Sequence, residues 1–226
     1  MRCLPQRHRP AKVGKKVGKE KGGMIPKVLF SYSPVYDQKI TEIVHKVHYD
    51  YGTFPAKARQ YIKKTETAWR KIAAKILLEM PKVCGLKWRR DIICYVVTRD
   101  LHTPFSTPLT IGFMRGETEI TTERFWRILV HELVHVLTMQ QERKTVSKAF
   151  SNIHSKYAKE SIVTQNHILV DAVLWHIYLK FFGEKVLKQR IEIESGARDY
   201  KKAWQIVEKE GYKNILAEFG KHLKGK

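Results

Sequence analysis

The spacing of hydrophobic positions predicts a chain built mainly of helices. Apolar residues recur at helical spacing in residues 35–49 and 55–79, and Pro81 and Gly85 are expected to end this helical region. Residues 184–222 predict two or three further helices by the same criterion. Most of the chain is therefore expected to fold by packing the apolar faces of helices together.

Two other helices are predicted to be buried, because they are apolar on nearly every side. The first covers residues 121–141, and Thr121 or Thr122 can cap its first turn. The second covers residues 161–182 and can end at Gly183. The stretch between them, ERKTVSKAFSNIHSKYAKES, is interpreted as a basic linker.

Three β-rich runs precede the first buried helix. MIPKVLFSYS, which begins at Met24, DIICYVVTR at residues 91–99 and PLTIGFM at residues 108–114 each predict a strand. The sequence therefore predicts an α+β fold that is mainly helical. Its small sheet lies in residues 24–120, before the buried helix, and a helical part follows. Residues 24–226 are interpreted as one domain.

Basic residues are in large excess. The formal net charge is +21. Residues 1–23, with eight basic residues and one acidic residue, are interpreted as a disordered basic arm, or as an extension before a true start at Met24. Such a charge favours polyanions, so nonspecific binding of nucleic acid through the arm and the surface is one expectation. A solvated, lysine-rich surface is the alternative explanation.

Cysteine usage and hydropathy exclude several classes of protein. Cys3, Cys84 and Cys94 form no CxxC pair, and their odd number argues against a disulfide framework. Cys94 lies in an apolar run and is expected in the core. No run of eighteen apolar residues and no secretory signal are found, so we expect a cytoplasmic protein without a membrane span.

The first buried helix has three polar residues at its centre, in the sequence HELVH. His131 and His135 are four residues apart, so on a helix both imidazoles lie on one face and can reach one metal ion. Glu132 lies about 100° around the helix, where it can contact a water held by that ion. Without a ligand, burial of these groups would be unfavourable. The pattern therefore predicts two metal ligands and a general base.

This motif and its uncharged flanks, Ile128 to Val130 and Val136 to Leu137, resemble the zincin metallopeptidases. The resemblance implies one Zn²⁺ ion, a peptide or protein substrate, and hydrolysis of a peptide bond by a water molecule that Glu132 deprotonates. It also implies that the strand before the helix, PLTIGFM, is an edge strand that pairs with an extended substrate.

The third ligand is expected in the second buried helix, because VLTMQQ follows His135 and lacks the metzincin continuation of the motif. His167 and Asp171 lie four residues apart on one face of that helix. Gluzincins carry Glu-x-x-x-Asp at this spacing. That resemblance implies that His167 completes a three-histidine site and that Asp171 orients one of the motif histidines. Asp171 itself and Glu160 are the alternative third ligands.

Other polar side chains have less defined roles. Zincins often use a tyrosine or a histidine to stabilise the oxyanion. His154 is expected at the surface of the basic linker, and His176 in the core or near the surface, on the opposite side of its helix from His167. The candidates for the oxyanion are Tyr157, Tyr178 and Tyr200.

Two alternatives to a simple peptidase fit the same sequence. The first is a basic nucleic-acid-associated protein, similar to the SprT-like proteases that degrade proteins attached to DNA. Apart from charge, no zinc-finger, helix-turn-helix or RNA-binding signature supports it. The second is a noncatalytic zincin-like binding domain, which Glu132 argues against because a structural metal site needs no base.

Overall fold

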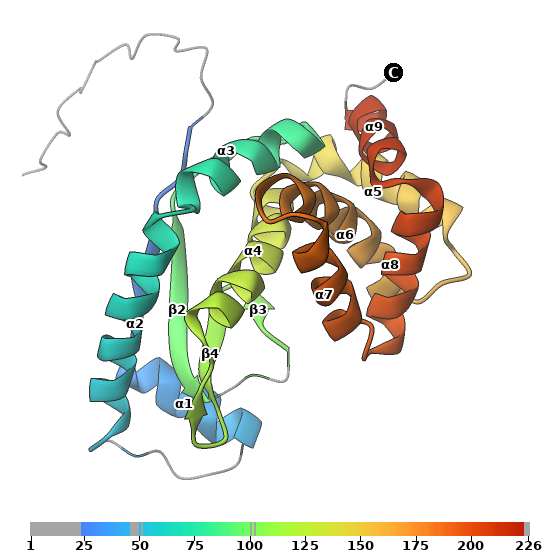
Figure 1. Ribbon diagram of the computed structural model, residues 1–226. Helices are drawn as coiled ribbons and strands as arrows, with labels where there is room; N and C mark the ends of the chain where they lie inside the picture. The colour runs from blue at the N-terminus through green and yellow to red at the C-terminus, as the bar shows by residue number, and fades with distance from the viewer. Residues whose placement is uncertain (1–23, 46–49, 51, 100, 102, 224–226) are drawn as a thin grey trace, which may run out of the picture.

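The structure is a computed structural model that describes residues 24–45, 50, 52–99, 101 and 103–223 (Figure 1). The arm predicted for residues 1–23, which contains Cys3, lies outside the described residues. Over the described ranges the chain has an α+β fold with nine helices and a mixed sheet of five strands. The predicted fold class is confirmed at this level.

The sheet has a parallel centre and an antiparallel outer edge. The strands β1 (Val28–Ser31), β2 (Ile92–Arg99) and β4 (Leu109–Arg115) lie side by side and run parallel. Two short strands, β3 (Phe105–Ser106) and β5 (Thr118–Glu119), pair antiparallel with opposite ends of β4. The prediction of an open edge along PLTIGFM is therefore wrong at both ends of the strand, because β3 and β5 pair with the side of β4 that faces away from β2.

Helices cover both faces of the sheet. On one face, the ring of Tyr61 in α2 (Phe54–Arg70) stacks on Phe113 of β4 with 4.6 Å between centroids. On the other, the hydroxyl of Tyr36 in α1 (Pro34–His45) lies 2.9 Å from Thr110 Oγ1. The sheet is thus held between α1 and the helices α2 and α4.

The helix α3 (Ala73–Cys84) continues through Pro81 and ends at Gly85, which has φ 73°. The prediction that Pro81 stops the helix is wrong. Proline removes the N–H that would bond to the carbonyl of Leu77, four residues earlier. The indole Nε1 of Trp88 donates to that carbonyl at 2.7 Å, so the buried acceptor keeps a partner and the helix is not interrupted.

Both helices predicted to be buried are present. In α4 (Thr122–Met139) the side chain of Thr121 accepts a hydrogen bond from the N–H of Arg124, and Ser161 caps α6 (Ile162–Phe181) in the same way. The helix α4 lies between the sheet and the C-terminal helices (Figure 1). Its polar centre is therefore enclosed from two sides.

The predicted basic linker is a helix, α5 (Arg143–Lys156). Val146, Ala149 and Ile153 recur at helical spacing and face the core, where α5 packs against α9. The many lysines of the segment occupy its solvent side and conceal this short apolar stripe. The interpretation as a linker is therefore wrong.

Three helices complete the chain, at the upper end of the predicted number: α7 (Glu184–Glu194), α8 (Arg198–Glu210) and α9 (Tyr212–Leu223). Cys84 and Cys94 are buried free thiols, and Cys94 belongs to the core as predicted. Among the helices that the structure describes, none combines the length and the apolar character needed to cross a membrane.

Candidate metal centre

The motif residues lie in the middle of α4, where the helix is covered by other elements. His131 and Glu132 are buried, with 5% and 6% of their surfaces exposed, and His135 is partly buried. The ring centroids of His131 and His135 lie 5.2 Å apart, as expected for residues one turn apart on the same helical face.

The helix α6 brings His167 to the same point. Its ring centroid lies 5.3 Å from that of His131 and 5.2 Å from that of His135. One nitrogen from each of the three imidazoles lies within 4.8 Å of the other two. The helices α4 and α6 lie next to each other (Figure 1), and together they supply three nitrogen donors around one small volume.

The lowered pKa values of His135 and His167 suit metal ligands, because a histidine must be neutral to bind a metal ion. Burial, together with the charges of His131 and His167, lowers the pKa of His135 to about 3. Burial and His131 likewise lower the pKa of His167 to about 4. The Nδ1 atom of His167 lies 2.7 Å from the carbonyl oxygen of Val163 and can donate to it, so Nε2 keeps a free lone pair. Three imidazole nitrogens form a donor set that fits Zn²⁺.

Glu132 lies beside this cluster and contacts the sheet edge. The hydroxyl of Ser106, in β3, donates to Oε2 of Glu132 at 2.6 Å. Burial raises the pKa of Glu132 above its ordinary value, and His131 and Ser106 partly offset that effect. Ser106 was not among the predicted site residues, because nothing in the sequence PFSTP indicates that the segment would reach α4.

His131 has a second set of neighbours, on α7. Oε1 of Glu194 lies 3.4 Å from Nδ1 of His131, and the guanidinium of Arg190 lies 3.2 Å from the same nitrogen. Arg190 and Glu194 form a buried ion pair, and Trp204 Nε1 donates to Oε2 of Glu194 at 2.9 Å. Burial opposes ionisation of Glu194, but Arg190, His131 and Trp204 outweigh it and hold its pKa below the ordinary value.

Sequence reasoning missed Arg190 and Glu194. They are one turn apart on α7, like many surface ion pairs, and no local pattern distinguishes them. The only indication in the sequence was indirect. Because the neighbouring helices are hydrophobic, a polar group from another segment had to contact the buried side of His131.

Asp171 lies one turn after His167 on α6 and is fully buried. It forms a second group with His131 and Glu194, whose ligand atoms also lie within 4.8 Å of one another. The guanidinium of Arg190 at Nδ1 of His131 disfavours a cation in that group. Neither carboxylate oxygen of Asp171 has a hydrogen-bond partner within the described chain, and burial, with Glu194, raises its pKa well above the ordinary value.

Glu160 does not reach the cluster. Because Ser161 caps α6, Glu160 precedes the helix and is not carried onto its inner face. Its carboxylate instead lies 3.4 Å from the ammonium of Lys202. Of the three residues considered as third ligand, His167 is the one that shares a volume with both motif histidines.

Of the three tyrosines, Tyr200 lies at the cluster: its ring centroid is 4.3 Å from that of His167. Burial, followed by the charge of Glu132, raises the pKa of Tyr200. Tyr178 is fully buried against Arg190, and Tyr157 lies at a different cavity, beside Lys156. The structure thus brings one of the three candidates to the site.

The two other histidines whose positions were predicted, His154 and His176, lie elsewhere. His154 is on α5, with Nε2 3.1 Å from Oδ1 of Asn166. His176 is on α6, with Nε2 2.9 Å from Oε1 of Glu79 in α3, which also pairs with Lys180. Both have partners outside the cluster, in agreement with their predicted positions away from the site.

A cavity of about 370 Å³ adjoins the cluster. His131, Glu132 and Tyr200 contribute to its wall, together with residues near the start of α4 and the end of α7, with Pro104 before β3 and with Arg115 at the end of β4. Its volume is typical of a pocket that holds a small ligand or part of a chain. A molecule in this cavity would therefore be in contact with Glu132.

Comparison of the chain with protein-family models, with curated proteins and with solved structures gives no match. Function is therefore inferred from the geometry and chemistry of the site itself.

Proposed function

We propose that this protein is a zinc-dependent metallopeptidase with a zincin-like arrangement of its site. The observation that carries the proposal is the convergence of His131, His135 and His167 on one volume, with Glu132 beside them. Three protein ligands and one open position are the usual coordination of a catalytic zinc ion, whereas structural zinc has four protein ligands. The adjoining cavity supports a site that is open to substrate.

Each residue would have a separate task. The three histidines hold the ion, which when bound supplies a Lewis acid that acidifies a water molecule and polarises the substrate carbonyl. Glu132 takes the proton of the attacking water and passes it to the leaving amine. Because the hydroxyl of Ser106 donates a hydrogen bond to Oε2 of Glu132, Oε1 would be the atom that carries this proton.

Tyr200 would stabilise the developing negative charge on the carbonyl oxygen. Its ring contacts that of His167, and it lines the cavity together with Glu132. A phenolic O–H directed at an oxyanion is a common means of lowering the barrier of acyl transfer. An extended substrate would pair through its backbone with the outer edge of β3, beside Ser106. This pairing would present the scissile bond to Glu132.

Two measurements test the proposal. The first is zinc content by mass spectrometry for the wild-type protein and for His135→Ala, His167→Ala, Asp171→Ala and Glu160→Ala. We expect stoichiometric zinc in the wild type, loss in both histidine variants, and retention in Glu160→Ala, which serves as the control. Undiminished zinc in His135→Ala would refute the site, and loss of zinc in Asp171→Ala or Glu160→Ala with retention in His167→Ala would reassign the third ligand.

The second measurement is hydrolysis of an unfolded protein substrate by the wild type and by Glu132→Gln. We expect the variant to keep its zinc and to lose hydrolysis, because an amide cannot accept the proton. Full activity of Glu132→Gln would contradict the proposed role of Glu132 as the general base. A wild type that binds zinc but hydrolyses no substrate would instead favour the noncatalytic alternative.

Association with nucleic acid remains a separate prediction. The basic arm that motivates it lies outside the described residues. Deletion of residues 1–23 is expected to abolish a salt-dependent retardation of nucleic acid if the arm binds it electrostatically.

A further inference from the structure

The cavity beside Glu132 follows one face of α4. Arg124, Ile128, His131 and Glu132 all line it, at the helical spacing that places residues on one side. Seven residues separate Arg124 from His131, and at a rise of 1.5 Å per residue this is about 10 Å along the axis. An extended peptide covers about 3.3 Å per residue, so the cavity spans the length of roughly three residues.

Four arginines line this cavity, and two of them are already paired. Arg127 pairs with Glu123 on α4, and Arg190 pairs with Glu194 on α7. These two guanidiniums are neutralised by their own neighbours. They shape the wall of the cavity but leave little charge for a ligand.

The other two, Arg115 and Arg124, have no carboxylate within ion-pair distance among the residues that the structure describes. Arg115 ends β4 and Arg124 lies in the first turn of α4, so two separate elements supply them. Between them and Glu132, the wall includes the apolar side chains of Ile128, Ile193 and Pro104. The cavity thus has an apolar lining and two guanidiniums that lack an internal partner.

We propose that Arg115 and Arg124 bind a carboxylate of the substrate, so that the protein selects peptides with a carboxylate within about three residues of the scissile bond. This inference rests on the proposed peptidase function and names its substrate class. Guanidinium groups bind carboxylates through paired N–H donors, and both Arg115 and Arg124 are exposed, so a ligand in the cavity can reach them. An acidic side chain and a free C-terminus are the two sources of such a carboxylate.

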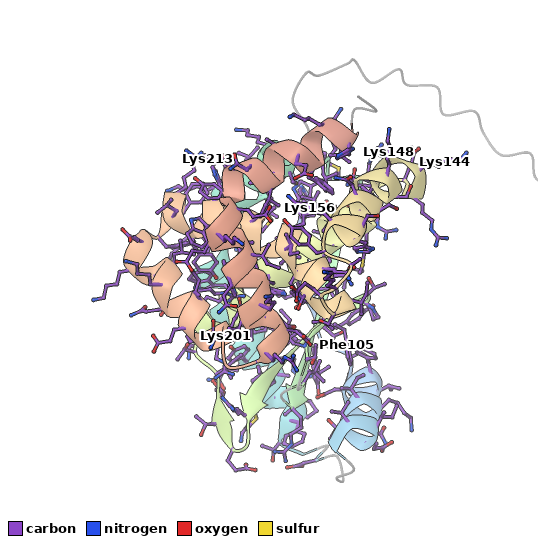
Figure 2. All side chains as sticks on the ribbon, turned by 90° about the vertical axis from the view of Figure 1, so that its right-hand side faces the viewer. Phe105, Lys144, Lys148, Lys156, Lys201 and Lys213 are labelled. Carbon is purple, nitrogen blue, oxygen red and sulfur yellow. The ribbon has the colours of Figure 1, made fainter. Side chains whose placement is uncertain are left out.

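Positive charge next to the site agrees with an acidic substrate. Lys201 follows Tyr200 on α8, and Figure 2 shows it well apart from Lys144 and Lys148 of α5, which add positive charge farther along the same side of the molecule. All three are exposed, and none forms an ion pair with any residue that the structure describes. A positive field around a site raises the rate at which anionic ligands reach it.

A nucleic acid is a poorer occupant of the cavity itself. About 370 Å³ with apolar walls accommodates a few peptide residues but not a phosphate backbone with its bases. The lysines outside the cavity do not distinguish the two polyanions, so the test includes both.

The test measures binding to the Glu132→Gln protein, which should not consume the peptide. Four labelled peptides of one neutral sequence are compared by fluorescence anisotropy: one with a glutamate at its centre and an amidated end, one with a free C-terminus, one neutral and amidated, and one with a central lysine. The added change Arg124→Glu or Arg115→Glu reverses the charge at the pocket. Arg89→Glu is the matched control, because Arg89 is exposed and lies near Gln140, at the other end of α4.

We expect a carboxylate-bearing peptide to bind at least tenfold more tightly than the neutral one. We expect Arg124→Glu to abolish this preference and to favour the lysine peptide, with less than a twofold change in Arg89→Glu. Whichever of the first two peptides binds tightly identifies the source of the carboxylate. The proposal would be overturned if neutral and acidic peptides bound equally, or if Arg89→Glu and Arg124→Glu had equal effects. It would also be overturned if an oligonucleotide competed as well as the acidic peptide.

This design separates the two proposals. If the acidic preference is found and depends on Arg124, but the wild type hydrolyses nothing, the carboxylate pocket stands and the peptidase function fails. If the wild type hydrolyses acidic and neutral peptides equally well, the peptidase function stands and the pocket proposal fails. Zinc content, measured on every variant, shows whether a charge reversal has also disturbed the histidine cluster.

Discussion

Oε1 of Glu194 lies 3.4 Å from Nδ1 of His131, although the two residues are on different helices, α7 and α4. In a metal-bound histidine that coordinates through Nε2, Nδ1 carries the proton and needs an acceptor. Glu194 is in reach of that proton and is itself fixed by Arg190 and Trp204. Arg190, which lies 3.2 Å from the same nitrogen, can only donate, so Glu194 would be the acceptor for this proton and would set both the tautomer and the orientation of His131.

Glu194→Gln is expected to weaken zinc binding by about 10- to 100-fold, the usual effect of losing an outer partner of a ligating histidine. The variant keeps the size of the side chain but removes the charge that faces His131 and Arg190. Competition for zinc with a chromophoric chelator measures the change. Glu192→Gln, exposed on the same helix, is the control. Equal zinc affinity in both variants would contradict a positioning role for Glu194.

Tyr200→Phe is expected to lower kcat on the order of 100-fold, because it removes one donor to the oxyanion. Zinc content should not change, since the phenol is not a proposed ligand. Steady-state kinetics on a cleaved peptide, with zinc measured on the same sample, checks both points. Tyr157→Phe is the matched control, because Tyr157 lies at a different cavity. A loss of activity that merely follows a loss of zinc would count against this role.

The metal-free protein is expected to lose stability as the pH falls below about 6.5. His135 and His167 have folded pKa values lowered to about 3 and about 4, from an ordinary value of 6.5. The unfolded chain therefore takes up protons that the folded chain does not, and stability falls as pH decreases through this window. Each proton contributes a slope of up to about 1.4 kcal/mol per pH unit, and the slope vanishes below pH 3 to 4.

Urea unfolding of the chelator-treated protein at pH 7.5, 6 and 5 measures this dependence. In His167→Gln the slope should be reduced by about one proton. A midpoint that does not change between pH 7.5 and 5 would be incompatible with two buried, neutral histidines.

Trp88→Phe is expected to destabilise the fold by about 1–3 kcal/mol, because it leaves the buried carbonyl of Leu77 without a donor. In the double variant Pro81→Ala/Trp88→Phe, the N–H restored at position 81 can bond to that carbonyl within the helix. The double variant should therefore be more stable than Trp88→Phe alone. Equilibrium denaturation of the wild type, both single variants and the double variant gives the coupling energy. Additive effects would show that the indole bond does not compensate for the proline.

The parts of the site that sequence alone predicted are those fixed by local geometry. Helical periodicity places His131 and His135 on one face, and it places His167 on the inner face of α6. The exclusion of Glu160 required one further detail, the cap at Ser161, which fixes where α6 begins. Signals within one helix were therefore sufficient for His131 and His135, whereas His167 was one of three candidates and only the packing of α6 against α4 brings it beside them.

The remaining contacts depend on tertiary packing. Ser106 lies 26 residues before its partner Glu132 in the sequence, and Glu194 lies 63 residues after its partner His131. No local pattern relates such positions. The sequence of α5 reads as a linker because its apolar stripe is short and interrupted by lysines, and Pro81 reads as a helix end because its compensating donor, Trp88, lies beyond the helix.

His135 and His167 are on helices that the chain joins through α5, and α5 packs in turn on α9. An ion bound to both histidines would act as a removable cross-link that fastens the sheet-bearing half of the molecule to its helical half. Separation of the halves would then require release of the ion, and an ion at 100 times its Kd would oppose that opening by about 2.7 kcal/mol. Susceptibility to a general protease would consequently report metal loading, with chelation converting a resistant chain into a readily digested one.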